Sequence, residues 1–292
     1  YARYVHESGK GTRTQLTPYV GFGDQKIESR YGATVTSLER SDVVAGLRAS
    51  HAMRISSYLN VEAGLDLEVA TYTVERRGSL GLPAREGDVR VFGQPPPDAI
   101  GFDRFDTTQV GVAPYVEADI APFGDRLHIV PGLRIDPMFR SVSRRIPQEG
   151  DNPSVGLFAQ DFVAEPRLSV RWSVIDRLTL HGATGLYHQQ PSPQDLSATF
   201  GNPALGVSKA VHLVGGAAIQ AMDELTVELT GFATYLDDLA MRNGQDAPRR
   251  AEAVLNTGRG RTFGLQALVR RELANHVFGW VAYTIMRSQR KN

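Results

Sequence analysis

The stretch of sequence that decides the fold is Leu59-Asn-Val-Glu-Ala-Gly-Leu-Asp-Leu-Glu-Val69. Every second residue, beginning with the first leucine, is apolar, and carboxylates stand between them at Glu62, Asp66 and Glu68. Successive side chains of a β-strand point to opposite faces, so this segment has one apolar face and one acidic face. A helix would mix the two kinds of side chain. The stretch therefore predicts a β-strand.

The same alternation returns along the chain, in segments longer than the roughly 5–6 residues that are usual for strands of soluble proteins. It is clear in residues 110–120, 127–136, 162–172, 211–220 and 225–230. Residues 19–53 alternate less clearly, and short connections are expected there at 23–25 and 39–42. No comparable amphipathic helix is found. The sequence therefore predicts an all-β protein.

The predicted connections alternate between short and long. Short turns are expected at residues 123–126, 175–177, 222–224 and 274–276, and long loops at 78–105, 143–160, 191–207 and 243–253. Barrels of the bacterial outer membrane have this arrangement, with short periplasmic turns and long extracellular loops. A closed antiparallel barrel also pairs every backbone group inside the bilayer.

Charge distribution favours the same architecture. A dry interior would have to bury Glu165, Arg167 and Arg171 on one strand face, at several kcal/mol for each unpaired ion. A water-filled lumen removes that cost, although a soluble sheet with one solvated face remains an alternative. We predict part of an antiparallel up-and-down transmembrane β-barrel, with about 13 long strands and an open sheet.

The composition excludes several classes of protein. The 292 residues include 32 Lys and Arg and 32 Asp and Glu, so the formal net charge is zero, which gives no electrostatic reason to bind nucleic acid. The chain has no cysteine, so disulfides, thiolate metal sites and cysteine nucleophiles are excluded. No run of about 18 apolar residues predicts a transmembrane helix.

Several short motifs resemble the TonB-dependent receptors of Gram-negative outer membranes. They are Ala113-Pro-Tyr-Val-Glu117, Leu127-His-Ile-Val-Pro-Gly-Leu-Arg-Ile-Asp136, Glu165-Pro-Arg-Leu-Ser169, Leu178-Thr-Leu-His-Gly-Ala-Thr-Gly-Leu-Tyr-His188 followed by Gln190-Pro-Ser192, and then Asn256-Thr-Gly258, Gly264-Leu-Gln266 and Trp280-Val-Ala-Tyr-Thr284. Their order matches successive hairpins of that family's barrel, with Gln266 in place of the commoner Glu. The resemblance covers about residues 110–286.

The resemblance implies energised uptake of a scarce ligand, such as a siderophore, cobalamin or a glycan, at the outer membrane of a Gram-negative bacterium. Residues 1–292 would be part of the barrel domain, since no plug domain or TonB box is recognisable in them. The implied partners are outer-membrane lipid, the transported ligand, the plug of the same full-length chain and the TonB complex acting through that plug. A passive porin-like channel and a soluble carbohydrate-binding or hydrolase domain are the alternatives.

Few residues suggest a specific site. Arg134, Arg140, Arg144 and Arg145 form a local basic group that would suit an anionic ligand, or would face the plug and lumen water. The histidines at 181, 188 and 212 lack the spacing of metal ligands, and His188 with Ser192 and Asp195 lacks the strand–turn–helix setting of a hydrolase triad. The acidic groups at 62, 66 and 68 and at 237 and 238 are interpreted as lumen wall and loop rim. We expect no enzyme activity, no metal and no cofactor.

Overall fold

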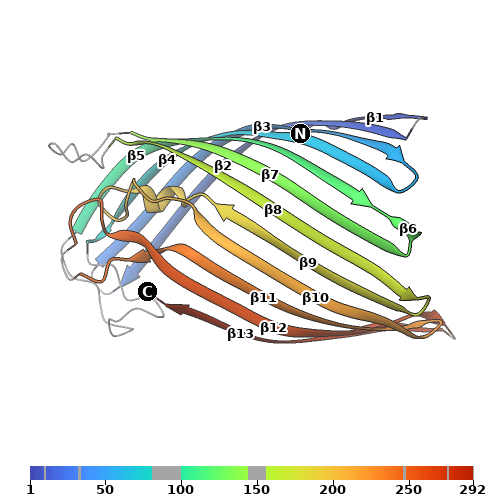
Figure 1. The fold of residues 1–292 in the computed structure, drawn as a ribbon. Coiled ribbons are helices and arrows are strands. Elements are labelled where there is room, and N and C mark those ends of the chain that lie inside the picture. Colours follow the sequence, from blue (N-terminus) through green and yellow to red (C-terminus); the bar gives the residue numbers. More distant parts are fainter. Residues whose placement is uncertain are drawn as a thin grey trace.

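A computed structural model describes residues 1–9, 11–31, 34–80, 100–143, 156–245, 248–274 and 276–291. Twelve strands form one antiparallel sheet in the order β1-β2-β3-β4-β5-β7-β8-β9-β10-β11-β12-β13 (Figure 1). The order of the strands in the sheet therefore follows their order in the sequence, which is an up-and-down topology. The all-β, up-and-down architecture predicted from the sequence is confirmed.

The strands are long and are joined by tight turns at one end. They are β1 (Tyr4–Ser8), β2 (Thr12–Tyr31), β3 (Thr34–Ser56), β4 (Leu59–Ser79), β5 (Ile100–Ile120), β6 (Pro122–Asp125), β7 (Leu127–Val142), β8 (Phe158–Ile175), β9 (Leu178–Gln189), β10 (Ser208–Met222), β11 (Leu225–Arg242), β12 (Val254–Ala274) and β13 (Val277–Lys291). One short 3-10 helix, η1 (Pro193–Leu196), lies between β9 and β10. No helix among the described residues is long and apolar enough to cross a membrane.

Two details differ from the sequence prediction. The sheet contains twelve strands where about 13 were expected, because the four-residue β6 lies in the β5–β7 turn and does not join the sheet order. The short connections expected at residues 23–25 and 39–42 do not exist. Residues 24 and 42 instead lie within the continuous β2–β3 ladder, whose Cα partners run from Thr12 opposite Met53 to Tyr31 opposite Thr34.

Strand pairing places the two kinds of side chain on opposite faces of the sheet. Glu68 pairs with Gly46 and with Gly111, and these positions share the lumen face, whereas Val69 pairs with Ala45 and Val110 on the other. Large apolar side chains stay exposed on that outer face, among them Val20, Val43, Val69, Val116, Leu133, Leu168, Leu213, Leu229 and Leu265. Such a continuous apolar surface is typical of a barrel wall that faces lipid.

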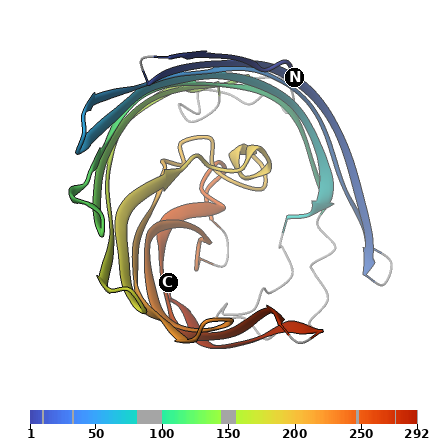
Figure 2. The same ribbon diagram turned by 90° about the vertical axis from the view of Figure 1, so that its right-hand side faces the viewer.

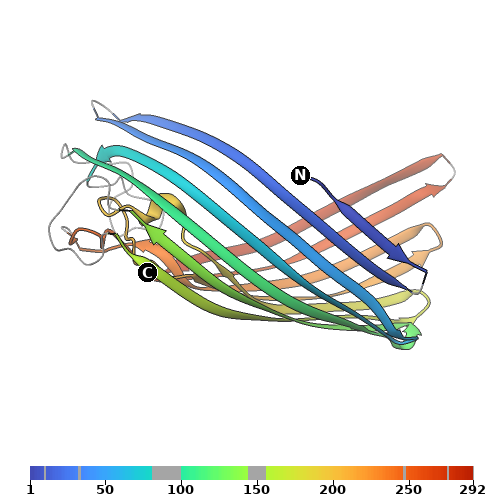
Figure 3. The ribbon, with the colours of Figure 1, turned by 90° about the horizontal axis from the view of Figure 1, so that it is seen from above.

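The sheet curves around a lumen and remains open. No described strand pairs with the outer edge of β1 or of β13, so the predicted open sheet is confirmed. Viewed along the barrel, the segment between β9 and β10, which carries η1, projects from the wall into the lumen (Figure 2). Seen from above, the β9–β10 loop lies at the end of the sheet opposite to the tight turns that join β3 to β4, β8 to β9 and β10 to β11 (Figure 3). A soluble sandwich would require a second layer of sheet, and the described part of the chain contains none.

Candidate functional site in the barrel lumen

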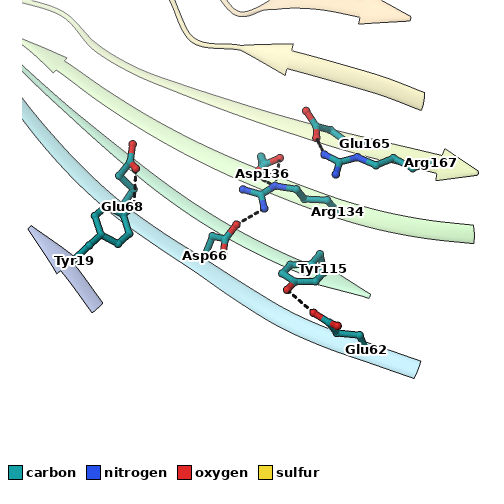
Figure 4. A network of polar contacts seen from close by, with 9 residues as sticks. All are labelled: Tyr19, Glu62, Asp66, Glu68, Tyr115, Arg134, Asp136, Glu165 and Arg167. Carbon is teal, nitrogen blue, oxygen red and sulfur yellow. Dashed lines mark hydrogen bonds and ion pairs between the residues drawn. The ribbon is translucent and has the colours of Figure 1, made fainter. Parts of the chain in front are cut away.

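The lumen face of the wall carries a band of hydrogen-bonded polar side chains (Figure 4). At one end of the band the Tyr19 hydroxyl donates to Glu68 Oε2 at 2.6 Å, linking β2 to β4 across β3. Further along β4, Glu62 Oε1 accepts a hydrogen bond of 3.1 Å from the Tyr115 hydroxyl. These contacts join strands that are not all adjacent and so stiffen the wall.

Close approach between strands explains the position of Tyr115. Its Cα partner on β4 is Gly64, and a Cβ atom at that glycine would lie 2.3 Å from the Tyr115 ring. Because glycine has no side chain, the ring can lie flat over the neighbouring backbone. This placement directs the hydroxyl along β4 to Glu62.

Arg134 lies at the centre of the band. Its Nη1 atom is 2.5 Å from Asp66 Oδ2, and its Nε atom donates to both oxygens of Asp136 at 2.9 and 3.0 Å. The guanidinium is three-quarters buried between two carboxylates that come from β4 and β7. Its charge is therefore already neutralised within the wall.

Glu165 forms a second buried centre on β8. Its side chain is 6% exposed and its Oε2 atom accepts a bond of 2.7 Å from Arg167 Nη2. Its Oε1 atom accepts a bond of 2.7 Å from the backbone N–H of His188. The Arg167 guanidinium also lies over the Tyr187 ring, 4.9 Å from the ring centroid. Charge-assisted contacts of this kind fix the side chains in one arrangement.

Two cavities lie against this band. One of about 390 Å³ is lined by Arg48, Glu62 and Tyr115 among others, and one of about 440 Å³ by Tyr19, Glu68 and His188 among others. Five of the nine residues drawn in Figure 4 are carboxylates and two are arginines, and a further arginine, Arg48, lines both cavities with its guanidinium 5.7 Å from the Tyr19 ring centroid. This part of the wall can form hydrogen bonds with a polar solute, water or a polar protein surface.

The loop between β9 and β10 forms the outer boundary of the site. Its apolar residues Leu196 and Leu205 are buried against residues from the outer ends of four strands, namely Val74, Phe105, Val142 and Val254. Phe200 is also buried, beneath the Arg76 guanidinium at 4.7 Å. The described apolar core of the molecule therefore lies inside the mouth of the barrel, where it holds this loop in place.

Polar contacts anchor the same loop to three strands. Asp103 of β5 accepts hydrogen bonds from the Ser197 hydroxyl and from the Thr199 backbone N–H. Arg140 of β7 donates to the carbonyl oxygens of Pro203 and Leu205. Two further contacts come from β12, where Asn256 Oδ1 accepts from Gly206 N at 2.8 Å and the Val254 carbonyl accepts from Asn202 Nδ2 at 3.1 Å.

The four arginines proposed from the sequence do not form one described group. Arg134 belongs to the polar band and Arg140 to the loop anchor, and Arg140 is only 4% exposed. Arg144 and Arg145 lie outside the described residues. A role for these four residues in ligand binding stays a prediction.

The other residues considered from the sequence have separate partners. His181 contacts Thr230 at 3.1 Å, and the His212 ring lies 4.8 Å from the Tyr187 ring. Asp237 pairs with Arg259 and Asp238 with Lys209. No group of three or more His, Cys, Asp or Glu residues suited to a metal ion occurs in the part of the chain that the structure describes.

Sequence reasoning missed the residues that hold the loop. Asp103, Ser197 and Asn202 were not singled out, because each depends on a partner far away in the sequence, as with the separation of 94 residues between Asp103 and Ser197. Asn256 had a usable signal, since it begins the Asn256-Thr-Gly258 motif. In the structure Gly258 is tightly enclosed, because a Cβ atom there would lie 2.2 Å from Met241 Cγ.

Comparison with known protein families gives a direct result. The family described as TonB dependent receptor-like, beta-barrel, matches residues 2–291. The chain belongs to this family. TonB-dependent receptor barrels are outer-membrane receptors and transporters of Gram-negative bacteria rather than enzymes, and the resemblance inferred from the sequence motifs is confirmed. No curated protein matches the chain in sequence.

Solved structures of TonB-dependent receptors share the fold. The copper transporter OprC superposes with a TM-score of 0.70 at 13% identity, covering 98% of this chain and 45% of its own. The ferric yersiniabactin uptake receptor FyuA from Yersinia pestis gives 0.68 at 12% identity, covering 99% and 42%. The ferric citrate transporter FecA gives 0.66 at 15% identity, also covering 99% and 42%. The chain thus spans less than half the length of these receptors.

Proposed function

We propose that this chain forms part of the barrel wall and the extracellular loops of a receptor for energised uptake of a scarce small ligand across the outer membrane. The observation that carries the proposal is the two-sided wall, apolar outside and polar inside, with the β9–β10 loop anchored across its mouth. A wall of this kind separates lipid from an aqueous path. Family membership adds the energy source, the TonB complex.

Two further components, the plug and the TonB complex, would act together with this wall. The plug would be supplied by the same full-length chain, and the TonB complex would act through that plug. The solved relatives carry copper, ferric yersiniabactin and ferric citrate, as their names state. For this chain the proposed ligand is of siderophore, cobalamin or glycan type. Residues of the outer loops and the upper lumen wall would contact it, with Arg134, Arg140, Arg144 and Arg145 as candidates.

Uptake by cells that carry the full-length receptor tests this function. Labelled ferric siderophores, cobalamin and oligosaccharides are supplied separately to a deletion strain and to the strain complemented with the receptor gene. We expect one class to accumulate only in the complemented strain, and accumulation to stop when TonB is removed. Accumulation that persists without TonB would support the passive porin-like channel instead. Accumulation of no class above the deletion strain would reject both.

A variant of the loop gives a second readout. Replacing residues 192–206 with a short glycine-serine linker removes the anchored segment while leaving the ends of β9 and β10 in place. We expect ligand affinity to change while the barrel still folds. The matched control replaces Asp223 and Glu224, in the tight β10–β11 turn at the opposite end of the wall, with glycine and serine. Unchanged affinity in the loop variant would show that the ligand makes no use of this segment.

A further inference from the structure

The strand ladder between β8 and β9 stops halfway along β8. Pairing of the two strands ends with Arg167 opposite Gly185, whereas on its other side β8 stays paired with β7 as far as Phe158. β8 therefore continues past the end of β9 towards the outer mouth (Figure 1). No described strand pairs with the second edge of residues 158–166, which we call the open edge of β8.

Two residues of β8 mark the point where the ladder ends. Pro166, next to the last paired residue, has no backbone N–H and cannot donate a ladder hydrogen bond. One position further, the buried Glu165 carboxylate accepts a bond of 2.7 Å from the backbone N–H of His188 in β9. A side chain here takes the place that a backbone carbonyl has in a continuous ladder. The separation of the two strands is therefore built into the sequence of β8.

Beyond this point the chain leaves the wall towards the lumen. β9 ends at Gln189, and two residues later the Pro191 carbonyl accepts a bond of 3.4 Å from the Gln109 side chain of β5. The carbonyl of Leu205, near the other end of the loop, accepts from Arg140 of β7, which is the Cα partner of Gln109. The β9–β10 loop thus lies on the lumen side of β5 and β7, and it does not continue in the wall beside β8.

Further strands of a complete barrel would not pair with the open edge of β8. β8 and β9 are neighbours in the sheet order, whereas additional strands would join the sheet beside β1 or β13. The open edge is therefore a property of the wall between two consecutive strands.

The level of the open edge in the membrane follows from strand length. A barrel strand needs about 9–11 residues to cross the hydrocarbon, where every backbone group has to be paired. Arg167, the last residue paired with β9, is the ninth residue of β8 counted back from Ile175 at the tight turn. The ladder is thus complete where lipid surrounds it, and the open edge begins where the wall emerges at the cell surface.

Two exposed aromatic side chains accompany the open edge. Phe158 and Phe162 are 66% and 72% exposed. Because side chains alternate along a strand, both share the outer face of the wall with Leu168. Side chains of an added strand would lie beside these two rings as cross-strand neighbours, which is the contact that stabilises paired strands.

We propose that the open edge of β8 binds an extended segment of another polypeptide at the cell surface by β-strand addition. A peptide backbone presents N–H and C=O groups at the spacing of a strand edge, which a lipid or a sugar does not. Apolar side chains at alternate positions of the bound segment would pack against Phe158 and Phe162. The inference rests on the outer-membrane placement in the proposed function, and it assigns a site in the wall, separate from ligand passage through the lumen.

Hydrogen exchange of the full-length receptor in detergent tests the proposal. The probes are a ten-residue peptide of alternating valine and threonine and the same peptide with every backbone amide N-methylated. In the receptor alone, amides of residues 158–165 that do not face β7 should exchange as unpaired amides do. The first peptide should slow them about tenfold or more, because it pairs with the open edge. The methylated peptide should leave them unchanged, and Phe162→Ala should weaken binding of the first peptide about threefold.

The matched control is Val43→Ala on β3. Val43 is 47% exposed and is the fourteenth residue from its tight turn, as Phe162 is on β8, but it has paired neighbours on both sides, Phe22 and Thr71. This variant should bind the peptide like the wild type.

Three results would overturn the proposal. Slow exchange of these amides in the receptor alone would mean that the edge is already paired, and unchanged exchange with the first peptide would mean that it accepts no strand. Equal binding of the methylated peptide would show an apolar surface instead of a strand edge. The assay does not measure transport, so its failure leaves the uptake measurement untouched, and a failure of uptake leaves the open edge untouched.

Discussion

The buried guanidinium of Arg140 in β7 holds the carbonyl oxygen of Leu205 in the β9–β10 loop. The same group also donates to the Pro203 carbonyl at 3.4 Å. Its Nε and Nη1 atoms are buried without a hydrogen-bond partner. The contact therefore stabilises the loop while the unsatisfied nitrogens destabilise the wall around it.

Replacing Arg140 with methionine should release the loop without unfolding the barrel. The loop loses contacts worth about 1–3 kcal/mol, so its amides should exchange roughly tenfold faster or more, while the global unfolding free energy stays nearly unchanged. Hydrogen exchange of residues 196–206 in the full-length receptor measures this. Arg126→Gln, which breaks an exposed ion pair of 3.5 Å with Asp176, is the control. Identical exchange in both variants would contradict the anchoring role.

Asp103 and Ser197 should be energetically coupled. Both side chains are about 2% exposed or less, and the Ser197 hydroxyl donates to the carboxylate while it accepts from the Phe200 N–H at 2.9 Å. Ser197→Ala leaves a buried carboxylate short of a donor, so a double-mutant cycle with Asp103→Asn should show a coupling of about 1–3 kcal/mol. Hydrogen exchange of the loop gives the free energies. Additive effects of the two substitutions would count against the contact.

Gly201 should not tolerate a side chain. A Cβ atom there would lie 2.0 Å from the Asp195 carbonyl oxygen, a backbone atom that cannot move without opening the loop. Gly201→Ala should therefore expose the loop to protease added to whole cells. Gly244→Ala is the matched control, since nothing lies within 4 Å of its Cβ position. Equal protease resistance of both variants would show that the loop adapts.

Two neighbouring alanines should differ in how far an introduced arginine lowers the unfolding free energy. Ala217 pairs with Leu180 and Leu229 on the lipid face, whereas Ala218 pairs with Glu228 on the lumen face. Arginine near the middle of the lipid face costs about 2–4 kcal/mol. We expect Ala217→Arg to lower the unfolding free energy by that amount and Ala218→Arg to leave it nearly unchanged. Urea unfolding of the receptor in vesicles measures both, and similar losses would refute the assignment of faces.

The wall could be predicted from sequence because its environment imposes a local pattern. Lipid on one side and water on the other require alternation along every strand, as in the stretch from Leu59 to Val69. Short turns at one end also leave local signals, and those at residues 123–126 and 222–224 lie between β5 and β7 and between β10 and β11, as expected. Residues 19–53 were harder, because the glycines and polar residues of β2 and β3 imitate turn signals within continuous strands.

The candidate site depended on partners that no local pattern reveals. Arg134 could be singled out by its charge, but its position between Asp66 and Asp136 follows from the register of three strands. The loop is held by contacts between residues 50 to 96 positions apart, such as Asn256 with Gly206 and Thr199 with Asp103. Contacts between residues so far apart leave no local pattern in a single sequence, so they could not be predicted from it.

The inward fold of the β9–β10 loop changes the shape of the conduit itself. The cavity of about 440 Å³ on the wall is lined in part by Gln190, where this loop begins, so the loop borders the cavity on one side. A solute that passes along this wall would have to go around the β9–β10 loop, because the loop narrows the lumen. The width available to it would then depend on side chains such as Leu196 and Phe200, and not simply on how many strands complete the circumference.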